Sequence, residues 1–423
     1  MTHISPKNLL KKAVKSASKA SSRTATPASS RHASDLEEDG LSEGSDSTLD
    51  SLSSFQDDMG NVDWSDELKK NIEELSEKRT TARESTLLRL AKILSHKYLD
   101  EDLYLQRDTI MDTLKKCIKR SGSVQERILA AKVIVLCFIT LGAGEESLYK
   151  DVSPILKSIV HDTTEPDVLS AVINCLAVIS FVASTDELET LKLMDMFTVI
   201  FKDSHRSPQT IVSAVNAHGL LFTTLGGSSR ITRSIFDSTM PILTRLLESS
   251  NVEIRVSSGE SMALMIEILR DNCDSPFRYD RMKTLIASLN SLATDCSKHR
   301  SKKDRSAQRS AFREIIGSID DEQSPELKLK FRGEVITFTG WSEIKQLNAF
   351  REALTEGLHV HFQYNDLLHD IFEVSFTPDM ENDSQYSSNY VISPSSELSK
   401  LRSQDMAKQR QRRGNREGLN DYY

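Results

Sequence analysis

Apolar residues recur every three or four positions along most of the chain, from Asp66 to about residue 320. Leu68, Ile72 and Leu75 start this pattern, and the following segments continue it. Side chains with this spacing lie on one face of an α-helix, where they can pack against a neighbour. After the first helical segments we expect five helix pairs, each with a shorter helix followed by a longer, more apolar one. The expected pairs are Thr109–Lys119 with Val124–Leu141, Val152–Val160 with Asp167–Val182, Glu189–Phe201 with Pro208–Leu225, Ile235–Glu248 with Val252–Leu269, and Arg281–Leu292 with Arg305–Ile319.

A repeated segment gives the period of these pairs. Pro154-Ile-Leu-Lys-Ser-Ile-Val recurs as Pro241-Ile-Leu-Thr-Arg-Leu-Leu, 87 positions later. Half of this distance is about 43 residues, which is in the range of HEAT and armadillo repeats. One pair cannot bury its apolar face alone, so neighbouring pairs must stack. The sequence therefore predicts an all-α fold, a right-handed armadillo- or HEAT-like α-solenoid of about five repeats over residues 66–322.

The spacing changes after residue 322. Glu334–Thr339 is rich in β-branched and aromatic residues, which is typical of a strand. Trp341–Leu354 has helical spacing, His359–Gln363 resembles a second short strand, and Asp366–Phe372 indicates a short helix. We expect residues 323–376 to form a small α+β domain that caps the end of the solenoid.

Both ends of the chain differ from this body in composition. Residues 1–65 are low in aliphatic residues and rich in Ser and Asp, so we expect a disordered leader. Residues 1–34 contain seven Lys or Arg and no acid, whereas residues 35–68 contain twelve Asp or Glu and no base. Residues 377–395 should form a polar linker, and residues 396–423 a basic C-terminal helix and tail. Because this helix has few large apolar residues, we expect it to become ordered on a partner.

Composition and cysteine usage indicate the compartment. The chain has 423 residues, a net charge of −8, and five cysteines, none of them in a Cys-x-x-Cys pair. This usage is typical of a reducing compartment. The longest apolar run, Val133–Leu141, falls well short of the roughly 20 residues that a membrane-spanning helix needs. We therefore expect a cytoplasmic protein. The acid-free, Lys- and Ser-rich segment Met1–Arg31 leaves a mitochondrial presequence open as an alternative to a disordered tail.

Catalytic and metal-binding patterns are weak. The chain has no GxGxxG, GxxxxGK[ST] or HExxH motif. His359 and His361 would share one face of the expected strand, but a metal pair there would have no third ligand nearby. His218 lies in an apolar helix, where a buried core histidine is the simpler interpretation. We expect neither an enzyme nor a cofactor.

Two basic elements remain, and both suit RNA. The first, Lys298–Arg313, contains a single acid, Asp304, and in a helix most of its cations share one stripe. We expect Phe312, Ile315 and Ile319 to anchor this helix on the repeat before it and to leave the cations exposed. The second element is the C-terminal tail. The candidate RNA-binding residues are Lys298, Arg300, Lys302, Lys303, Arg305, Arg309 and Arg313 in the first element, and Lys400, Arg402, Lys408, Arg410, Arg412, Arg413 and Arg416 in the second.

The chemistry of these cations favours a phosphate backbone. Arginine binds phosphate through paired hydrogen bonds, and lysine adds charge that does not depend on sequence. A rigid array with an inducible basic helix suits structured RNA better than a specific DNA site, since no major-groove recognition motif is present. Charged faces that are merely solvated are the alternative.

Three segments resemble the interferon-related developmental regulator family. They are Ala293–Glu314, which contains the first basic element, Gly259–Leu264 in the preceding repeat, and Gly357–Glu373 in the expected cap. The resemblance covers roughly residues 68–376. The tail of this chain is more compact than is usual in the family, which leaves open how far it could reach into a channel.

The resemblance implies an armadillo-like body with a smaller C-terminal domain, and one of two roles. The first is a non-catalytic factor on translationally inactive ribosomes, which occupies tRNA sites and places a C-terminal helix in the mRNA path. Its partners would be rRNA and ribosomal proteins near those sites, with no membrane and no small-molecule substrate. The alternative is a nuclear transcriptional co-regulator, a protein–protein scaffold that binds peptides on the solenoid. Only the first role uses both basic elements.

Overall fold

The computed structural model describes residues 63–120, 123–225, 229–271, 277–294, 302–331 and 334–374. All of them belong to one compact unit, residues 45–423, whereas Met1–Gly44, a separate unit, lies outside the described residues. The elements are α3 (Trp64–Glu74), α4 (Thr80–His96), α5 (Asp100–Lys119), α6 (Val124–Leu141), α7 (Glu146–Asp162), α8 (Pro166–Ala183), α9 (Glu187–Lys202), α10 (Pro208–Phe222), α11 (Ser229–Leu246), α12 (Val252–Asp271), α13 (Met282–Thr294), α14 (Lys302–Asp320), β1 (Glu326–Phe331), β2 (Glu334–Thr339), α15 (Gly340–Leu354), the 3₁₀ turn η2 (Thr355–Gly357), α16 (Leu358–Tyr364) and α17 (Asp366–Phe372).

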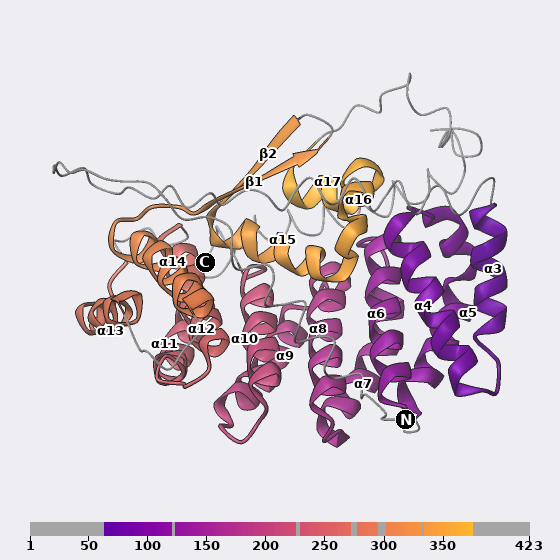
Figure 1. The fold of residues 1–423 in the computed structure, drawn as a ribbon, viewed down its shortest axis with the longest axis horizontal. Helices are drawn as coiled ribbons and strands as arrows, with labels where there is room; N and C mark the ends of the chain where they lie inside the picture. The colour runs from indigo at the N-terminus through magenta and orange to yellow at the C-terminus, as the bar shows by residue number, and fades with distance from the viewer. Residues whose placement is uncertain are drawn as a thin grey trace, which may run out of the picture. The chain divides into compact units, whose positions relative to one another are not determined.

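Consecutive helices pair and stack as an α-solenoid. The second helix of each pair packs on the second helix of the next, so that α4, α6, α8, α10, α12 and α14 form one continuous layer. Figure 1 shows these helices side by side along the array. The predicted all-α, armadillo-like solenoid is confirmed, and α3 with α4 adds a pair before the five that the spacing predicts.

Local signals set where the second helices begin. The hydroxyl of Ser123 accepts the backbone N–H of Glu126 at the start of α6, and Ser207 caps α10 in the same way through Thr210. Both α8 and α10 begin with a proline, whose missing N–H is not needed at the first helical position.

The predicted alternation of short and long helices is wrong for most pairs. The first helices are about as long as the second, with 20 residues in α5 and 17 in α7 against 18 in α6. The pair α13 and α14, with 13 and 19 residues, keeps the predicted difference. The first turns of the first helices are rich in charged residues, so the apolar periodicity begins later than the helix does. Pro154, placed by the sequence near a helix start, lies inside α7.

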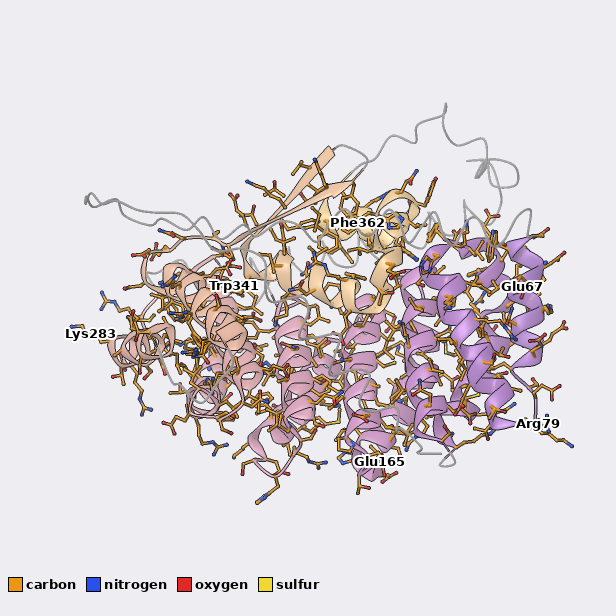
Figure 2. All side chains as sticks on the ribbon, in the orientation of Figure 1. Glu67, Arg79, Glu165, Lys283, Trp341 and Phe362 are labelled. Atoms are coloured by element: carbon orange, nitrogen blue, oxygen red, sulfur yellow. The ribbon has the colours of Figure 1, made fainter. Side chains whose placement is uncertain are left out.

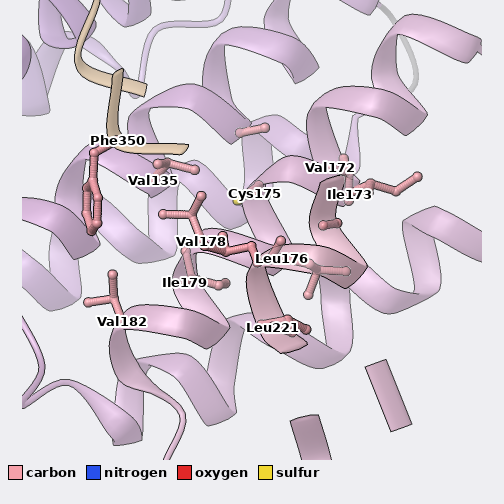
Figure 3. Packing of buried hydrophobic residues seen from close by; sticks show 14 of the residues in the cluster. Val135, Val172, Ile173, Cys175, Leu176, Val178, Ile179, Val182, Leu221 and Phe350 are labelled. Atoms are coloured by element: carbon pink, nitrogen blue, oxygen red, sulfur yellow. The ribbon is translucent and has the colours of Figure 1, made fainter. Parts of the chain in front are cut away.

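One helix of this layer is long and apolar enough to cross a membrane, which corrects the choice of Val133–Leu141 as the longest apolar run. It is α8, Pro166–Ala183, with a mean hydropathy of 1.9. Most of α8 is buried between α6 and α10 (Figure 3), so its apolarity follows from its place in the solenoid core.

The C-terminal segment contains a hairpin and three helices. Strand β2, helix α15 and helix α17 confirm the predicted strand and the two predicted helices. Sequence reasoning missed β1, which pairs antiparallel with β2. The predicted strand His359–Gln363 is wrong, because this segment is the helix α16.

Burial explains the error at α16. The side chains of Val360, His361 and Phe362 are all buried, so alternation along the chain does not separate two faces. His361 is held there by two contacts, from its Nε2 to the carbonyl of Leu94 at 2.9 Å and from its Nδ1 to the amide of Asn365 at 3.1 Å.

The expected cap at the end of the solenoid is also wrong, because the C-terminal segment runs back along the array. Helix α15 crosses the layer of second helices and contacts α12, α10, α6 and α4 (Figure 1). Phe350 of α15 belongs to the buried core (Figure 3) and makes an edge contact with Phe181 of α8. Further along the segment, the amide of Asn365 donates to the carbonyl of Ile139 in α6 at 2.9 Å.

Helix α14 packs closely on α12 at a glycine, Gly259. A Cβ at Gly259 would lie 2.9 Å from Cδ1 of Ile315 and 3.0 Å from Cε1 of Phe312, closer than normal van der Waals contact. Both of these α14 side chains are fully buried. Only glycine lets the two helices approach this closely.

We expect Gly259→Val to destabilise the protein, because the added methyl groups must push Phe312 and Ile315 out of place. Overpacking of this kind costs about 1–3 kcal/mol, to be read as a lower midpoint in urea unfolding. Gly144→Val is the control, since a Cβ there meets nothing within 4 Å. Equal urea midpoints for the two variants would contradict the close packing of α14 against Gly259.

We expect the two buried histidines to make the stability pH-dependent. Burial lowers the pKa of His218 and of His361 to about 4 in the folded state. The unfolded chain therefore takes up protons first as the pH falls below about 6.5, and stability decreases from there down to about pH 4. The loss approaches about 1.4 kcal/mol per pH unit for each histidine.

The test compares urea unfolding at pH 7 and pH 5. His218→Gln should lose less stability between these pH values than the wild type, because residue 218 no longer titrates. His205→Gln, at an exposed position, controls for the removal of a histidine. A loss in His218→Gln equal to that of the wild type would show that His218 does not contribute.

Candidate nucleic-acid interface

The structure describes part of the first basic element, and that part is on α14. Lys298 and Arg300 lie outside the described residues. Lys302 and Lys303 form the start of α14, although their side chains are not described. Arg305, Arg309 and Arg313 follow on the same helix at intervals of four residues, spanning about 12 Å along its axis.

The apolar side of α14 anchors it as expected. Phe312, Ile315 and Ile319 are all buried, which confirms the predicted anchor on the preceding repeat. Gln308 extends this buried side by one turn. Its amide donates to the carbonyl of Leu292 in α13 at 3.0 Å, and its carbonyl accepts from the guanidinium of Arg255 in α12. The helix is therefore fixed to both of its neighbours.

The three described arginines differ in exposure. Arg313 is exposed, whereas Arg305 and Arg309 are half-buried, so the expectation of a fully exposed stripe holds only for Arg313. Nε of Arg309 donates to the carbonyl of Arg305 at 3.3 Å. Nε of Arg305 is buried and has no hydrogen-bond partner among the described residues.

None of these three guanidinium groups forms an ion pair within the described part of the chain. Other arginines in the molecule do, such as Arg83 with Glu126 at 2.6 Å. A row of cations at four-residue spacing repels itself unless an anion lies nearby. The charge on this side of α14 is therefore available to an external anion.

Sequence reasoning missed further cations beside this helix. Arg278, Arg281 and Lys283 are exposed at and before the start of α13, the helix that packs against α14. Figure 2 shows the side chain of Lys283 pointing away from the neighbouring helices. The sequence feature that could have revealed these cations is the short segment Arg278–Lys283, which contains three bases and one acid. It was overlooked because the longer run after it dominates the local charge.

All seven predicted residues of the tail lie outside the described residues. They are Lys400, Arg402, Lys408, Arg410, Arg412, Arg413 and Arg416. Their part in an interface stays a prediction.

Among the described residues, the candidate metal-binding and catalytic groups do not form a recognisable site. They contain no group of three or more His, Cys, Asp or Glu side chains that could hold a metal ion. The candidate pair at His359 and His361 is on a helix, and both ring nitrogens of His361 contact protein groups. The chain has one Gly-x-Ser-x-Gly segment, at 40–44, but this lies in the acidic leader, outside the described residues.

His218 is a core residue, as expected. Its ring lies edge-on to Phe201 at 5.7 Å between ring centroids and stacks on Phe222. Burial in this apolar site accounts for its low pKa. Cys117, Cys137 and Cys175 are also buried, and burial raises their pKa, so all three remain thiols.

The likeness of this chain to solved structures is weak. A designed armadillo repeat protein matches 58% of this chain and 99% of its own, at 16% identity and a TM-score of 0.36. An engineered protein matches 60% of this chain and 97% of its own, at 15% identity and a TM-score of 0.38. At such scores these likenesses add nothing to the fold assignment, which rests on the helix packing.

Comparison of sequences is more informative. The family model for the interferon-related developmental regulators matches residues 9–320, up to the last residue of α14. Mouse interferon-related developmental regulator 2 is 32% identical over 322 residues, 73% of this chain and 72% of its own. Human interferon-related developmental regulator 1 is 31% identical over 326 residues, 73% of this chain and 70% of its own. This chain belongs to the interferon-related developmental regulator family.

Proposed function

We propose that the protein is a non-catalytic factor that binds ribosomal RNA and keeps ribosomes translationally inactive by occupying tRNA and mRNA sites. In this proposal the protein acts in the cytoplasm. Helix α14 supplies a fixed phosphate-binding surface, and the basic tail supplies a second contact that forms on the ribosome. Family membership supports a scaffold without catalytic activity, and an armadillo-like fold is suited to binding other macromolecules.

The observation that carries this proposal is that the arginines on α14 form no ion pair among the described residues. Arg305, Arg309 and Arg313 have no carboxylate partner among the described residues, although the helix itself is rigidly anchored through Phe312 and Ile315. A fixed helix with unpaired guanidinium groups loses little conformational entropy when it binds phosphate. Solvated charges on a protein surface do not need such an anchor.

The alternative is a nuclear co-regulator that binds peptides along the layer of second helices. Part of that surface already holds α15, which bonds to α8, α10 and α12 through side chains that a peptide would otherwise use. This occupancy favours the ribosomal proposal as the main function. A nuclear pool whose partners survive ribonuclease treatment would support the alternative.

Changing Arg305, Arg309 and Arg313 together to Gln should weaken co-sedimentation with ribosomes in sucrose gradients. Each lost phosphate contact lowers the slope of log K against log salt by about 0.7–0.9, so the triple variant should lose up to about 2–3 units. The wild-type protein should sediment with ribosomes at low salt.

The control is a triple variant with the same change in net charge, Lys69, Lys70 and Lys150 to Gln on α3 and α7, whose side chains are 44%, 63% and 68% exposed. If both triple variants have the same salt slope as the wild type, α14 is not the interface. If the wild-type protein stays at the top of the gradient in starved as well as growing cells, the ribosomal proposal fails.

A second variant tests the tail alone. Changing Arg410, Arg412, Arg413 and Arg416 to Ala should weaken ribosome binding and flatten its salt dependence by up to about 0.7 units for each contact to a single strand. The melting temperature should not change, because the described core makes its contacts without these residues. An unchanged salt slope would remove the tail from the mechanism and leave α14 as the remaining candidate.

A further inference from the structure

The hairpin of β1 and β2 has only two strands among the described residues. It lies on the side of α15 opposite the solenoid (Figure 1). Its inner face packs on an aromatic cluster, in which Phe338 of β2 contacts Phe362 at 5.8 Å and Phe372 at 5.3 Å between ring centroids. Its outer face is open to solvent, and Val335 there is 56% exposed. Because a sheet of two strands is marginally stable in water, a third strand would stabilise it.

The hydrogen bonds of the hairpin show which backbone groups of β2 face outward. The N–H of Gly340 donates to the carbonyl of Pro325 at 2.9 Å, which continues the ladder by one bonded pair. Bonded and non-bonded pairs alternate in an antiparallel ladder. Ile336 is therefore bonded to β1, whereas the N–H and C=O groups of Val335 and Thr337 point away from it. These outward groups have no hydrogen-bond partner in the part of the chain that the structure describes.

Charged side chains protect the edge of β1 but not that of β2. Lys328 and Lys330 are exposed along β1, and lysines on an edge strand oppose pairing with a further strand. The N–H of Thr339, at the end of β2, is already bonded to the carboxylate of Glu343 at 2.7 Å. The exposed side chains of β2 are all uncharged: Val335, Thr337 and Thr339. The open part of this edge therefore suits a short, uncharged strand.

The chain leaves the described residues beside this edge. The last described residue of the C-terminal segment, Val374, follows Phe372, whose ring contacts Phe338 of β2. Between residues 375 and 395 the sequence has a single run of three β-branched or aromatic residues, at 390–392 (Tyr-Val-Ile). The connection from residue 375 to residue 389 can span several times the length of β2, so this run can return to the edge.

We propose that residues 389–392 pair antiparallel with β2 and form the third strand of this sheet. The direction follows from the exit of the chain near Phe338, in the last part of β2, since a strand that starts there runs back along β2. Pro394 ends the strand, because proline has no N–H for a ladder. A segment of the same chain also has a high effective concentration at the edge, so it competes well with a second copy of the protein.

Side-chain alternation selects the register of this strand. Val391 lies opposite Val335 and bonds to its outward N–H and C=O groups, and Asn389 does the same for Thr337. The two large side chains at positions 390 and 392 then extend the inner face over the aromatic cluster. A shift by one residue would turn both of them to solvent.

The third strand fixes the point from which the basic tail begins. Without it, a flexible connection over residues 375–395 would have ends about 25 Å apart on average. With it, the tail starts four residues after Ile392, at a fixed place on the sheet. This consequence rests on the proposed function of the tail, whereas the strand pairing itself involves no RNA.

The test measures amide hydrogen exchange by NMR in the full chain, without ribosomes. The amides of Val335 and Thr337 should exchange about tenfold more slowly in the wild type than in Val391→Pro, because proline removes the donor for the carbonyl of Val335. The amide of Ile336, which is bonded to β1, should stay protected in both proteins and is the internal reference. Ser387→Pro, which lies before the strand, should exchange like the wild type.

A second variant separates the missing N–H from the loss of the valine side chain. Val391→Thr keeps both an N–H and a strand-forming residue, so it should keep the protection of Val335 and Thr337. Loss of protection in this variant, or unprotected amides at these two positions in the wild type, would overturn the proposal. Protection that survives in Val391→Pro would also contradict it, and a decrease on dilution would then assign the edge to a second copy of the chain.

Discussion

The attachment of α15 across the second helices is the interaction on which the other features of this structure depend. It begins at Glu267 of α12, whose carboxylate accepts the backbone N–H groups of Trp341 at 2.9 Å and Ser342 at 3.1 Å. These N–H groups are at the start of α15 and have no partner within the helix, so a carboxylate from another helix satisfies them and interacts favourably with the helix dipole. Gly340 allows this approach, since its φ of +86° and its contact of 3.1 Å from a Cβ position to Glu267 both disfavour a side chain.

The same helix, α12, also positions the candidate RNA-binding surface. Gly259 receives Phe312 and Ile315 of α14, while the next residue, Glu260, faces Lys345 of α15. The indole N–H of Trp341 donates to the hydroxyl of Ser318 at 2.7 Å, which joins the start of α15 to the last turns of α14. Helix α14 is therefore held from two sides, and the direction of its arginines is fixed by the core rather than by the surface.

Sequence reasoning recovers what local periodicity encodes. The five pairs, the anchor of α14 and the core role of His218 all follow from apolar residues at intervals of three and four, because each helix buries a face of its own. The strand β1 could also have been predicted from the sequence, since Leu327, Leu329 and Phe331 alternate with exposed charged residues. The lysines in that segment hid the alternation.

The path of the C-terminal segment could not be read from the sequence. The bond between Asn174 and Glu352 joins residues 178 positions apart, and the one between His361 and Leu94 joins residues 267 apart. Contacts this distant leave no period in the chain. The exposure of Arg305 and Arg309 was also out of reach, because it depends on how α13 and α12 enclose α14, and the buried Gln308 looks like a surface residue in the sequence.

Charge links α15 to α14 through Glu260 of α12. Partial burial, and in second place the negative charge of Glu260, raises the pKa of Glu314 on α14. Lys345 is the cation that α15 brings to Glu260, and burial lowers the pKa of Lys345 while Glu260 opposes this change. By bringing a cation to Glu260 of α12, helix α15 offsets negative charge on the helix against which α14 packs, and this favours the binding of anions on α14.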